Sequence, residues 1–146
     1  MCSSDLIVGS PNQTGLASGC YRYTLTGTDN VGNTTSIQTT VKVDTSDPTL
    51  SLAFSNLTGA TALNGSRVYF QPNAGSGGSF DVTASGTDND TDIAGYSFPA
   101  GAALGSNWSA SGSGASRSYS FSATATSNGT QTVQTTNNAG RTGSSS

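Results

Sequence analysis

Short segments in which apolar and polar residues alternate constrain the fold of this chain more than any other feature. In residues 21–26, Tyr21, Tyr23 and Leu25 fall on one face of an extended chain and polar residues fall on the other. The same alternation recurs in residues 37–43, 50–54, 68–70, 80–84, 93–98, 108–110, 119–123 and 131–136. Gly, Asn and Ser, which favour turns, separate these segments. The pattern predicts an all-β protein built as a β-sandwich.

The composition agrees with strands and argues against helices. Thr and Ser supply about a third of the chain, and Thr favours strands because its branched Cβ suits a pleated surface. Glu is missing and Lys42 is the single lysine, so the residues that usually fill exposed helix positions are nearly absent. Leu, Ile, Val and Phe make up 23 of 146 residues, a level at which disorder has to be considered. A net charge of only −3 speaks against disorder, and we expect no helix anywhere.

Three classes of function are disfavoured by charge and residue type. Five scattered Lys and Arg residues cannot form the basic stripe that nucleic acid requires. No apolar run approaches the roughly 18 residues that cross a bilayer, so we expect no membrane span. The chain has no His, the most common general base, and its carboxylates at 88–92 crowd one loop instead of flanking a bond. We therefore expect a protein that is not an enzyme.

A repeated loop indicates the domain organisation. Residues 28–34 (TDNVGNT) and 136–142 (TNNAGRT) are near copies, and 136 − 28 gives a spacing of 108 residues. This is close to the size of one immunoglobulin-type sandwich, about 100 residues. We expect residues 7–43 to be the C-terminal hairpin of a truncated domain, with its apolar face exposed. Residues 44–49 would then be a linker, and residues 50–146 a second domain that lacks most of its last strand.

Several segments resemble the bacterial immunoglobulin-like (Ig-like) repeats of large secreted or surface-anchored proteins. They are residues 19–24 (GCYRYT), 28–34 (TDNVGNT), 43–49 (VDTSDPT), 68–72 (VYFQP) and 107–112 (NWSASG). The resemblance implies an Ig-like β-sandwich in a tandem array, with neighbouring Ig-like modules as partners and an extracellular or cell-surface location. Family members serve as spacers, stalks and adhesin segments, and some accompany catalytic domains in secreted glycan-active enzymes. Tyr21 matches the tyrosine corner of such sandwiches, whereas Gln131 and Val133 occupy the corresponding stretch of the second copy.

The first six residues look foreign to the rest. Met1–Leu6 (MCSSDL) resembles the translated end of a common sequencing adapter, so we expect residues 1–6 to be a non-native leader. Without Cys2, Cys20 would be a lone cysteine, and we expect it to be a buried, small apolar residue.

An acidic loop is the strongest candidate for a metal site. Asp88, Asp90 and Asp92 stand at alternate positions, and oxygen ligands of this kind suit calcium. At one pole of the domain they could approach Asp44 and Asp47 of the linker, and a shared calcium ion would then stiffen the joint. An EF-hand is excluded because its required Gly and Glu positions hold other residues. The alternative is a solvated acidic loop without metal.

Two further residues have competing interpretations. Asp29, in the first repeated loop, could be a metal ligand, but its counterpart is Asn137 and both residues suit a turn-stabilising role. Trp108 could form a platform for a host-surface or environmental glycan, or it could belong to the core. Its polar neighbours Asn107 and Ser109 leave both possibilities open.

Overall fold

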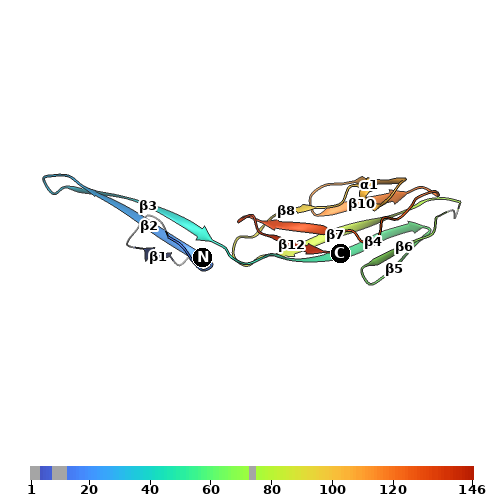
Figure 1. Cartoon of the computed structure of the whole chain (residues 1–146), viewed down its shortest axis with the longest axis horizontal. Coiled ribbons are helices and arrows are strands. Elements are labelled where there is room, and N and C mark those ends of the chain that lie inside the picture. Colours follow the sequence, from blue (N-terminus) through green and yellow to red (C-terminus); the bar gives the residue numbers. More distant parts are fainter. Residues whose placement is uncertain (1–3, 8–12, 73–74) are drawn as a thin grey trace. The chain divides into compact units, whose positions relative to one another are not determined.

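The computed structural model of the protein describes residues 4–7, 13–72 and 75–146. The chain forms two compact units, one of residues 1–46 with 89–91 and the other of residues 47–88 with 92–146. We call them the N-terminal and the C-terminal unit. Both consist almost entirely of strands, which confirms the predicted all-β class (Figure 1).

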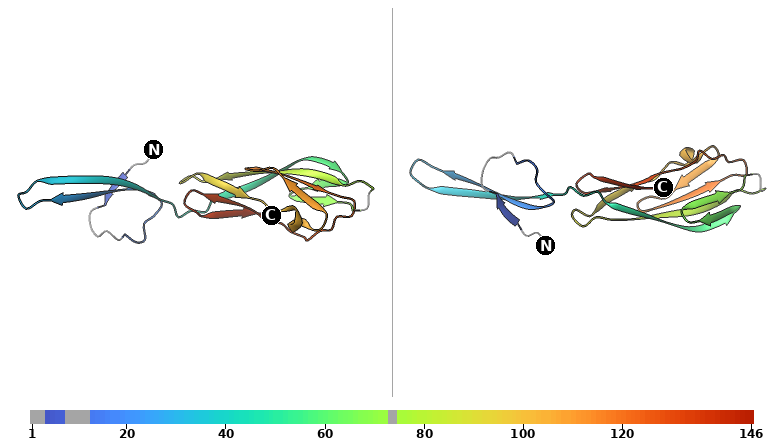
Figure 2. Two further views of the ribbon diagram at one scale, coloured as in Figure 1. Left: turned by 90° about the horizontal axis from the view of Figure 1, so that it is seen from above. Right: turned by 60° about the horizontal axis from the view of Figure 1, so that its bottom comes forward.

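The N-terminal unit contains one three-stranded sheet, with β2 in the centre. Its strands are β1 (Ser4–Ile7), β2 (Gly19–Thr28) and β3 (Thr34–Val43). β1 runs parallel to β2, whereas β2 and β3 form an antiparallel hairpin that is paired along its whole length (Figure 2). The hairpin turns within residues 29–33, where Gly32 adopts a φ of +91° that glycine tolerates without steric cost.

The β2–β3 hairpin leaves its apolar face uncovered, as the sequence predicted. Tyr21 lies opposite Val41 and Leu25 lies opposite Ile37, and residues directly opposite each other share a face of the sheet. Leu25, Ile37 and Val41 are 69%, 68% and 43% exposed, far above the values of core residues. A sheet face of this kind is normally covered by a second layer.

The C-terminal unit is a β-sandwich of two antiparallel sheets with an added hairpin (Figure 1). The first sheet has the order β4 (Thr49–Gly59), β7 (Gly78–Thr87), β10 (Ser116–Phe121) and β9 (Trp108–Ser111). The second has the order β12 (Thr142–Ser145), β11 (Val133–Asn137) and β8 (Ile93–Ser97). The separate hairpin comprises β5 (Thr61–Asn64) and β6 (Arg67–Phe70).

The core of this unit is built on the central strands of the first sheet. Phe80 and Val82 of β7 and Tyr119 of β10 are buried together. Apolar residues of β4, β6, β9 and the segment between β8 and β9 pack against them: Leu52, Phe54, Leu57, Val68, Phe98, Leu104, Trp108 and Ala110. The β4 register shifts between Ser55 and Thr58, so Leu57 packs on the core although it breaks the period of two.

The second sheet contributes polar side chains to the interior. Thr135 is fully buried and its hydroxyl donates to the backbone carbonyl of Gly95 over 3.1 Å. Asn137 is 1% exposed and is likewise hydrogen-bonded. A chain with few large aliphatic residues therefore fills part of its core with hydrogen-bonded polar groups, which avoids the cost of leaving them unsatisfied.

Three predictions from the sequence need correction. A single helical turn, α1 (Gly101–Leu104), forms where we expected no helix, because Ala and Leu in this segment have high helix propensity. Strand β5 was missed, although Asn64-Gly65 is a strong hairpin signal and Gly65 has a φ of +62°. Cys20 is buried, as predicted, but it is disulfide-bonded and not a lone thiol. Cys2 and the rest of residues 1–3 lie outside the described residues.

Candidate functional site

The first repeated loop is a hydrogen-bonded turn centred on Asp29. One carboxylate oxygen, Oδ1, accepts from the backbone N–H groups of Val31 at 3.0 Å and Asn33 at 2.8 Å. The other, Oδ2, accepts from the side-chain amide of Asn33 at 2.8 Å. The Asn33 side chain and the backbone amides of the loop lower the pKa of Asp29. The predicted turn-stabilising role of Asp29 is confirmed.

The second repeated loop has the same hydrogen bonds at positions 108 residues later. Oδ1 of Asn137 accepts from the backbone N–H groups of Ala139 at 3.1 Å and Arg141 at 2.9 Å. The backbone hydrogen bonds also correspond: the N–H of Asp29 donates to the carbonyl of Asn33, and the N–H of Asn137 donates to the carbonyl of Arg141. One difference is chemical: the Nδ2 amide of Asn137 donates to Oδ2 of Asp88 over 3.1 Å, which a carboxylate could not do.

Two of the predicted calcium ligands belong to the N-terminal unit and already accept hydrogen bonds there. Asp44 accepts from the hydroxyl of Thr91 and from the backbone N–H of Ser46. Asp90 accepts from the Ser46 hydroxyl over 3.3 Å. These contacts bring together the loop and the linker segment that the sequence had paired, through hydroxyl and amide donors.

The other three predicted ligands belong to the C-terminal unit. Asp47 forms an ion pair with Arg141 at 2.7 Å, and Asp88 accepts from Asn137. Asp92 adopts a φ of +61° and its backbone carbonyl accepts from the Asn138 amide at 3.1 Å. Within residues 4–7, 13–72 and 75–146, no group of three or more His, Cys, Asp or Glu side chains could hold a metal ion. Calcium binding stays a prediction.

Trp108 lies in an aromatic cluster of the C-terminal unit. Its ring contacts Phe70, Phe80 and Phe121 at centroid distances of 5.1, 6.1 and 4.8 Å. The indole N–H donates to the backbone carbonyl of Thr126 over 2.7 Å. The side chain is half-buried, so it serves the core while part of it stays accessible. Glycan binding by Trp108 stays a prediction.

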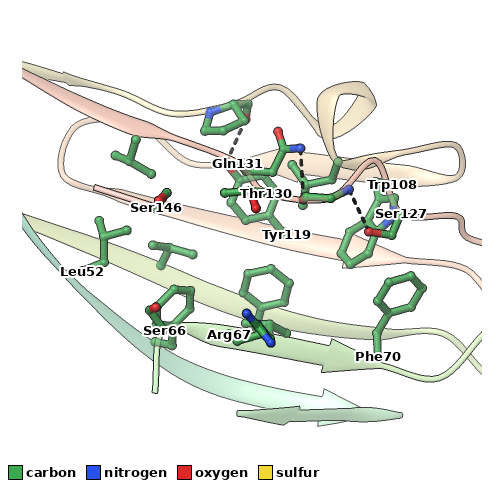
Figure 3. Close-up of a pocket in the computed structure, with 18 residues that line it drawn as sticks. Leu52, Ser66, Arg67, Phe70, Trp108, Tyr119, Ser127, Thr130, Gln131 and Ser146 are labelled. Carbon is green, nitrogen blue, oxygen red and sulfur yellow. Dashed lines mark hydrogen bonds between the residues drawn. The ribbon is translucent and has the colours of Figure 1, made fainter. Parts of the chain in front are cut away.

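A cavity of about 560 Å³ lies between the two layers of the C-terminal unit (Figure 3). Its walls are mostly apolar and aromatic, and they include Leu52, Phe70, Trp108 and Tyr119. Further lining, mainly polar, comes from the β5–β6 hairpin, the segment before β11 and the residue after β12: Ser66, Arg67, Ser127, Gly129, Thr130, Gln131 and Ser146. Its volume lies in the range typical of ligand sites, about 300–1,000 Å³.

The Tyr119 hydroxyl reaches the edge of this cavity and donates to the Pro99 carbonyl over 2.8 Å. Burial raises the pKa of Tyr119. Its phenol is therefore held neutral and acts as a fixed donor that ties β10 to the segment before α1.

A second, open hollow of about 360 Å³ lies on the surface beside Trp108. It is lined by Trp108 and Phe121 together with four small polar residues: Asn107, Ser109, Ser120 and Ser122. The hydroxyls of Ser109 and Ser120 are 2.7 Å apart and bond to each other across the β9–β10 pair. An aromatic ring beside hydroxyl and amide groups is chemically suited to a sugar ring.

Reasoning from the sequence named Trp108 as a possible ligand contact but missed the polar residues that line the cavity, above all Arg67 and Gln131. A signal for Gln131 exists in the sequence, because residues 131–136 are predicted as one strand, which places Gln131 on the same face as Val133. Arg67 has no such signal, since its place depends on the β5–β6 hairpin.

Comparisons with known proteins leave the chain without an assigned family. No family model, no curated protein and no solved structure matches it. Within the described residues, no helix is long and apolar enough to cross a membrane.

Proposed function

We propose that this chain is a non-catalytic structural segment of a tandem Ig-like array, carried by a secreted or surface protein of a bacterium and supporting adhesion. The order of the strands in the C-terminal unit carries the proposal. Named A to G in chain order without the β5–β6 insertion, the strands form sheets A-B-E-D and G-F-C. Constant-type immunoglobulin sandwiches have the same strand order, which supports the proposal.

The N-terminal unit supports the array. Its loop at 28–34 has the hydrogen bonds of the loop at 136–142, so the β2–β3 hairpin corresponds to the β11–β12 hairpin that closes the sandwich. The uncovered apolar face of the hairpin suits packing against a second sheet of the same sandwich. The Tyr21 hydroxyl donates to the carbonyl of Ala17 over 2.8 Å, the local bond expected of a tyrosine corner.

A spacer role follows from these features. Repetition of a module of about 100 residues extends a binding domain away from its anchor, and each module has its own hydrophobic core. The C-terminal unit has such a core, centred on Phe80, Val82 and Tyr119. In this account the neighbouring Ig-like modules are the main partners of the segment, and it works outside the cell.

Single-molecule stretching tests this function. A concatemer of residues 47–146 should unfold in equal steps, one for each repeat. Since 146 − 47 + 1 gives 100 residues, the extended chain of one repeat measures about 330–360 Å. Each step should release this length less the end-to-end distance of the folded unit. A smooth extension without steps would show that the unit does not bear load as an independent module.

A second candidate function, glycan binding, is favoured by the hollow beside Trp108. Titration with oligosaccharides, followed by the fluorescence of this single tryptophan, tests it. The double variant Asn107→Ala, Ser109→Ala should weaken a genuine sugar complex while the aromatic cluster stays intact. An unchanged emission with every sugar, or equal affinity in the variant, would reject this role.

A further inference from the structure

The chain contains two Asn-Gly pairs, Asn64-Gly65 and Asn128-Gly129. In such a pair the backbone nitrogen of Gly can attack the side-chain amide carbon of Asn, because Gly has no side chain to hinder the approach. The attack closes a five-membered succinimide ring and releases ammonia. In a folded protein its rate depends on how freely the Asn side chain, the Gly N–H and the backbone between them can move.

Hydrogen bonds hold the second pair at each group that the attack requires. The Nδ2 amide of Asn128 donates to the carbonyl of Ala103 over 3.2 Å, and its backbone N–H donates to the carbonyl of Leu104 over 2.8 Å. The N–H of Gly129, which carries the attacking nitrogen, donates to the hydroxyl of Ser127 over 3.1 Å. Ring closure at Asn128 therefore has to break these bonds first.

The first pair lies at the turn of the β5–β6 hairpin and lacks such restraints (Figure 1). Asn64 ends β5 directly opposite Arg67, and both residues are exposed. Within the described part of the chain, no hydrogen bond holds the Asn64 side chain or the Gly65 N–H. A Cβ at Gly65 would have no atom within 4 Å, so open space surrounds the attacking nitrogen's residue.

The backbone at Asn64 also opens more easily than the rest of the unit. β5 and β6 form a two-stranded sheet of four residues each, separate from the two larger sheets, and a hairpin of this size is marginally stable by itself. The far end of β6 is anchored, because the Phe70 ring contacts Trp108 and Phe121. The turn end consists of exposed residues, so local opening there gives Asn64 the freedom that ring closure requires.

We propose that Asn64 is a site of spontaneous covalent modification, whereas the fold protects Asn128. The nitrogen of Gly65 forms a bond to Cγ of Asn64 and loses its proton, and Nδ2 takes up a proton and leaves as ammonia. Water, the only co-reactant, then opens the succinimide at either of its two carbonyls. The product at position 64 is aspartate or isoaspartate. This inference does not depend on the proposed Ig-like module.

Both products change the turn. Each places a carboxylate opposite Arg67, which has no ion-pair partner within the described residues. Isoaspartate also lengthens the backbone by one carbon atom, because the chain then continues through the former side chain. An insertion at the end of β5 disturbs its register with β6, the strand that packs Val68 on the core. The modification would thus alter both the charge and the pairing of this hairpin.

The test incubates the full chain at mildly alkaline pH, which favours attack by the Gly nitrogen. Ion-exchange chromatography follows the new negative charge, and peptide mapping by mass spectrometry locates aspartate and isoaspartate at positions 64 and 128. A parallel sample in urea gives the rates of the two pairs without the fold. Two variants serve as a matched pair: Asn64→Gln removes the proposed site, and Asn128→Gln removes the protected one.

In the folded chain we expect modification at Asn64 to be at least tenfold faster than at Asn128, and in urea we expect the two rates to become similar. The acidic species should disappear in Asn64→Gln and form at the parental rate in Asn128→Gln. Equal rates in the folded chain, faster modification at Asn128, or a ratio that persists in urea would overturn the proposal. An unmodified Asn64 in a folded sample whose urea counterpart is modified would overturn it as well.

Discussion

The two repeated loops provide a matched pair of substitutions. Asn137 and Asp29 make the same turn with Oδ1, but Asn137 is 1% exposed and its amide donates to Asp88, whereas the Asp29 loop is exposed. In Asn137→Asp a carboxylate oxygen replaces the donor 3.1 Å from the Asp88 carboxylate. Loss of a hydrogen bond to a charged acceptor lowers the free energy of unfolding by about 1.5–3 kcal/mol. Burial of a like charge without a partner brings the total loss to roughly 3–5 kcal/mol. Asp29→Asn keeps the Oδ1 acceptor and should cost about 1 kcal/mol or less.

Urea unfolding followed by Trp108 fluorescence measures the cost of Asn137→Asp, because Trp108 lies in the same unit as Asn137. Asp29 lies in the N-terminal unit, so hydrogen exchange of the β2–β3 amides measures the cost of Asp29→Asn. The penalty in Asn137→Asp should also depend on pH. When two carboxyl groups share a site, the pKa of one of them is raised in the folded state. The pKa of an Asp in the unfolded chain is about 3.9. The penalty should therefore grow as the pH rises from about 4 to 7 and shrink as it falls. Equal costs for the two variants, or a penalty independent of pH, would refute the reasoning.

Three further predictions concern packing, ionisation and metal. Gly143→Ala should lower the free energy of unfolding by about 1–3 kcal/mol, since a Cβ there would lie 1.9 Å from the Pro48 carbonyl oxygen. As a control, Gly95→Ala meets no atom within 4 Å and should be neutral or slightly stabilising. Equal urea midpoints for the two variants would contradict this prediction. Because burial raises the pKa of Tyr119 in the folded state, the stability of the protein should fall as the pH rises above about 10. Between pH 9 and 11 the variant Tyr119→Phe should therefore lose less stability than the parent protein, and an identical loss of stability would contradict this prediction. Millimolar calcium should change the melting temperature by less than about 2 °C relative to EDTA, because the acidic side chains near residues 88–92 already accept hydrogen bonds from the protein. A rise on the order of 10–20 °C would support a bound ion instead.

The sequence predicted the strands well because their faces differ in polarity. Phe80 and Val82 alternate with polar neighbours, and the structure buries them in β7. The period of two could not predict β5, whose side chains are mostly exposed, or the bulge that turns Leu57 inward. Both depend on how neighbouring strands pair, which a local pattern does not contain.

The candidate site was predictable only where its interactions are local. The Asp29 turn joins residues two to four positions apart, so turn chemistry was sufficient to predict it. The bond between Asn137 and Asp88 joins residues 49 positions apart, and the ion pair of Asp47 with Arg141 also links distant segments. For this reason the acidic loop could be recognised in the sequence, while its hydrogen-bond partners could not.

The order of the strands in the C-terminal unit is the central claim, because the proposed Ig-like module depends on it. Nuclear Overhauser contacts between backbone protons of residues 47–146 measure this order directly. We predict contacts from Gln134 to both Ser97 and Ser144, which place β11 between β8 and β12, and contacts from Ser118 to both Asp81 and Ser111. Pairing of β12 with β9 or β10, or the absence of contacts between β11 and β8, would contradict the Ig-like arrangement and with it the proposed function.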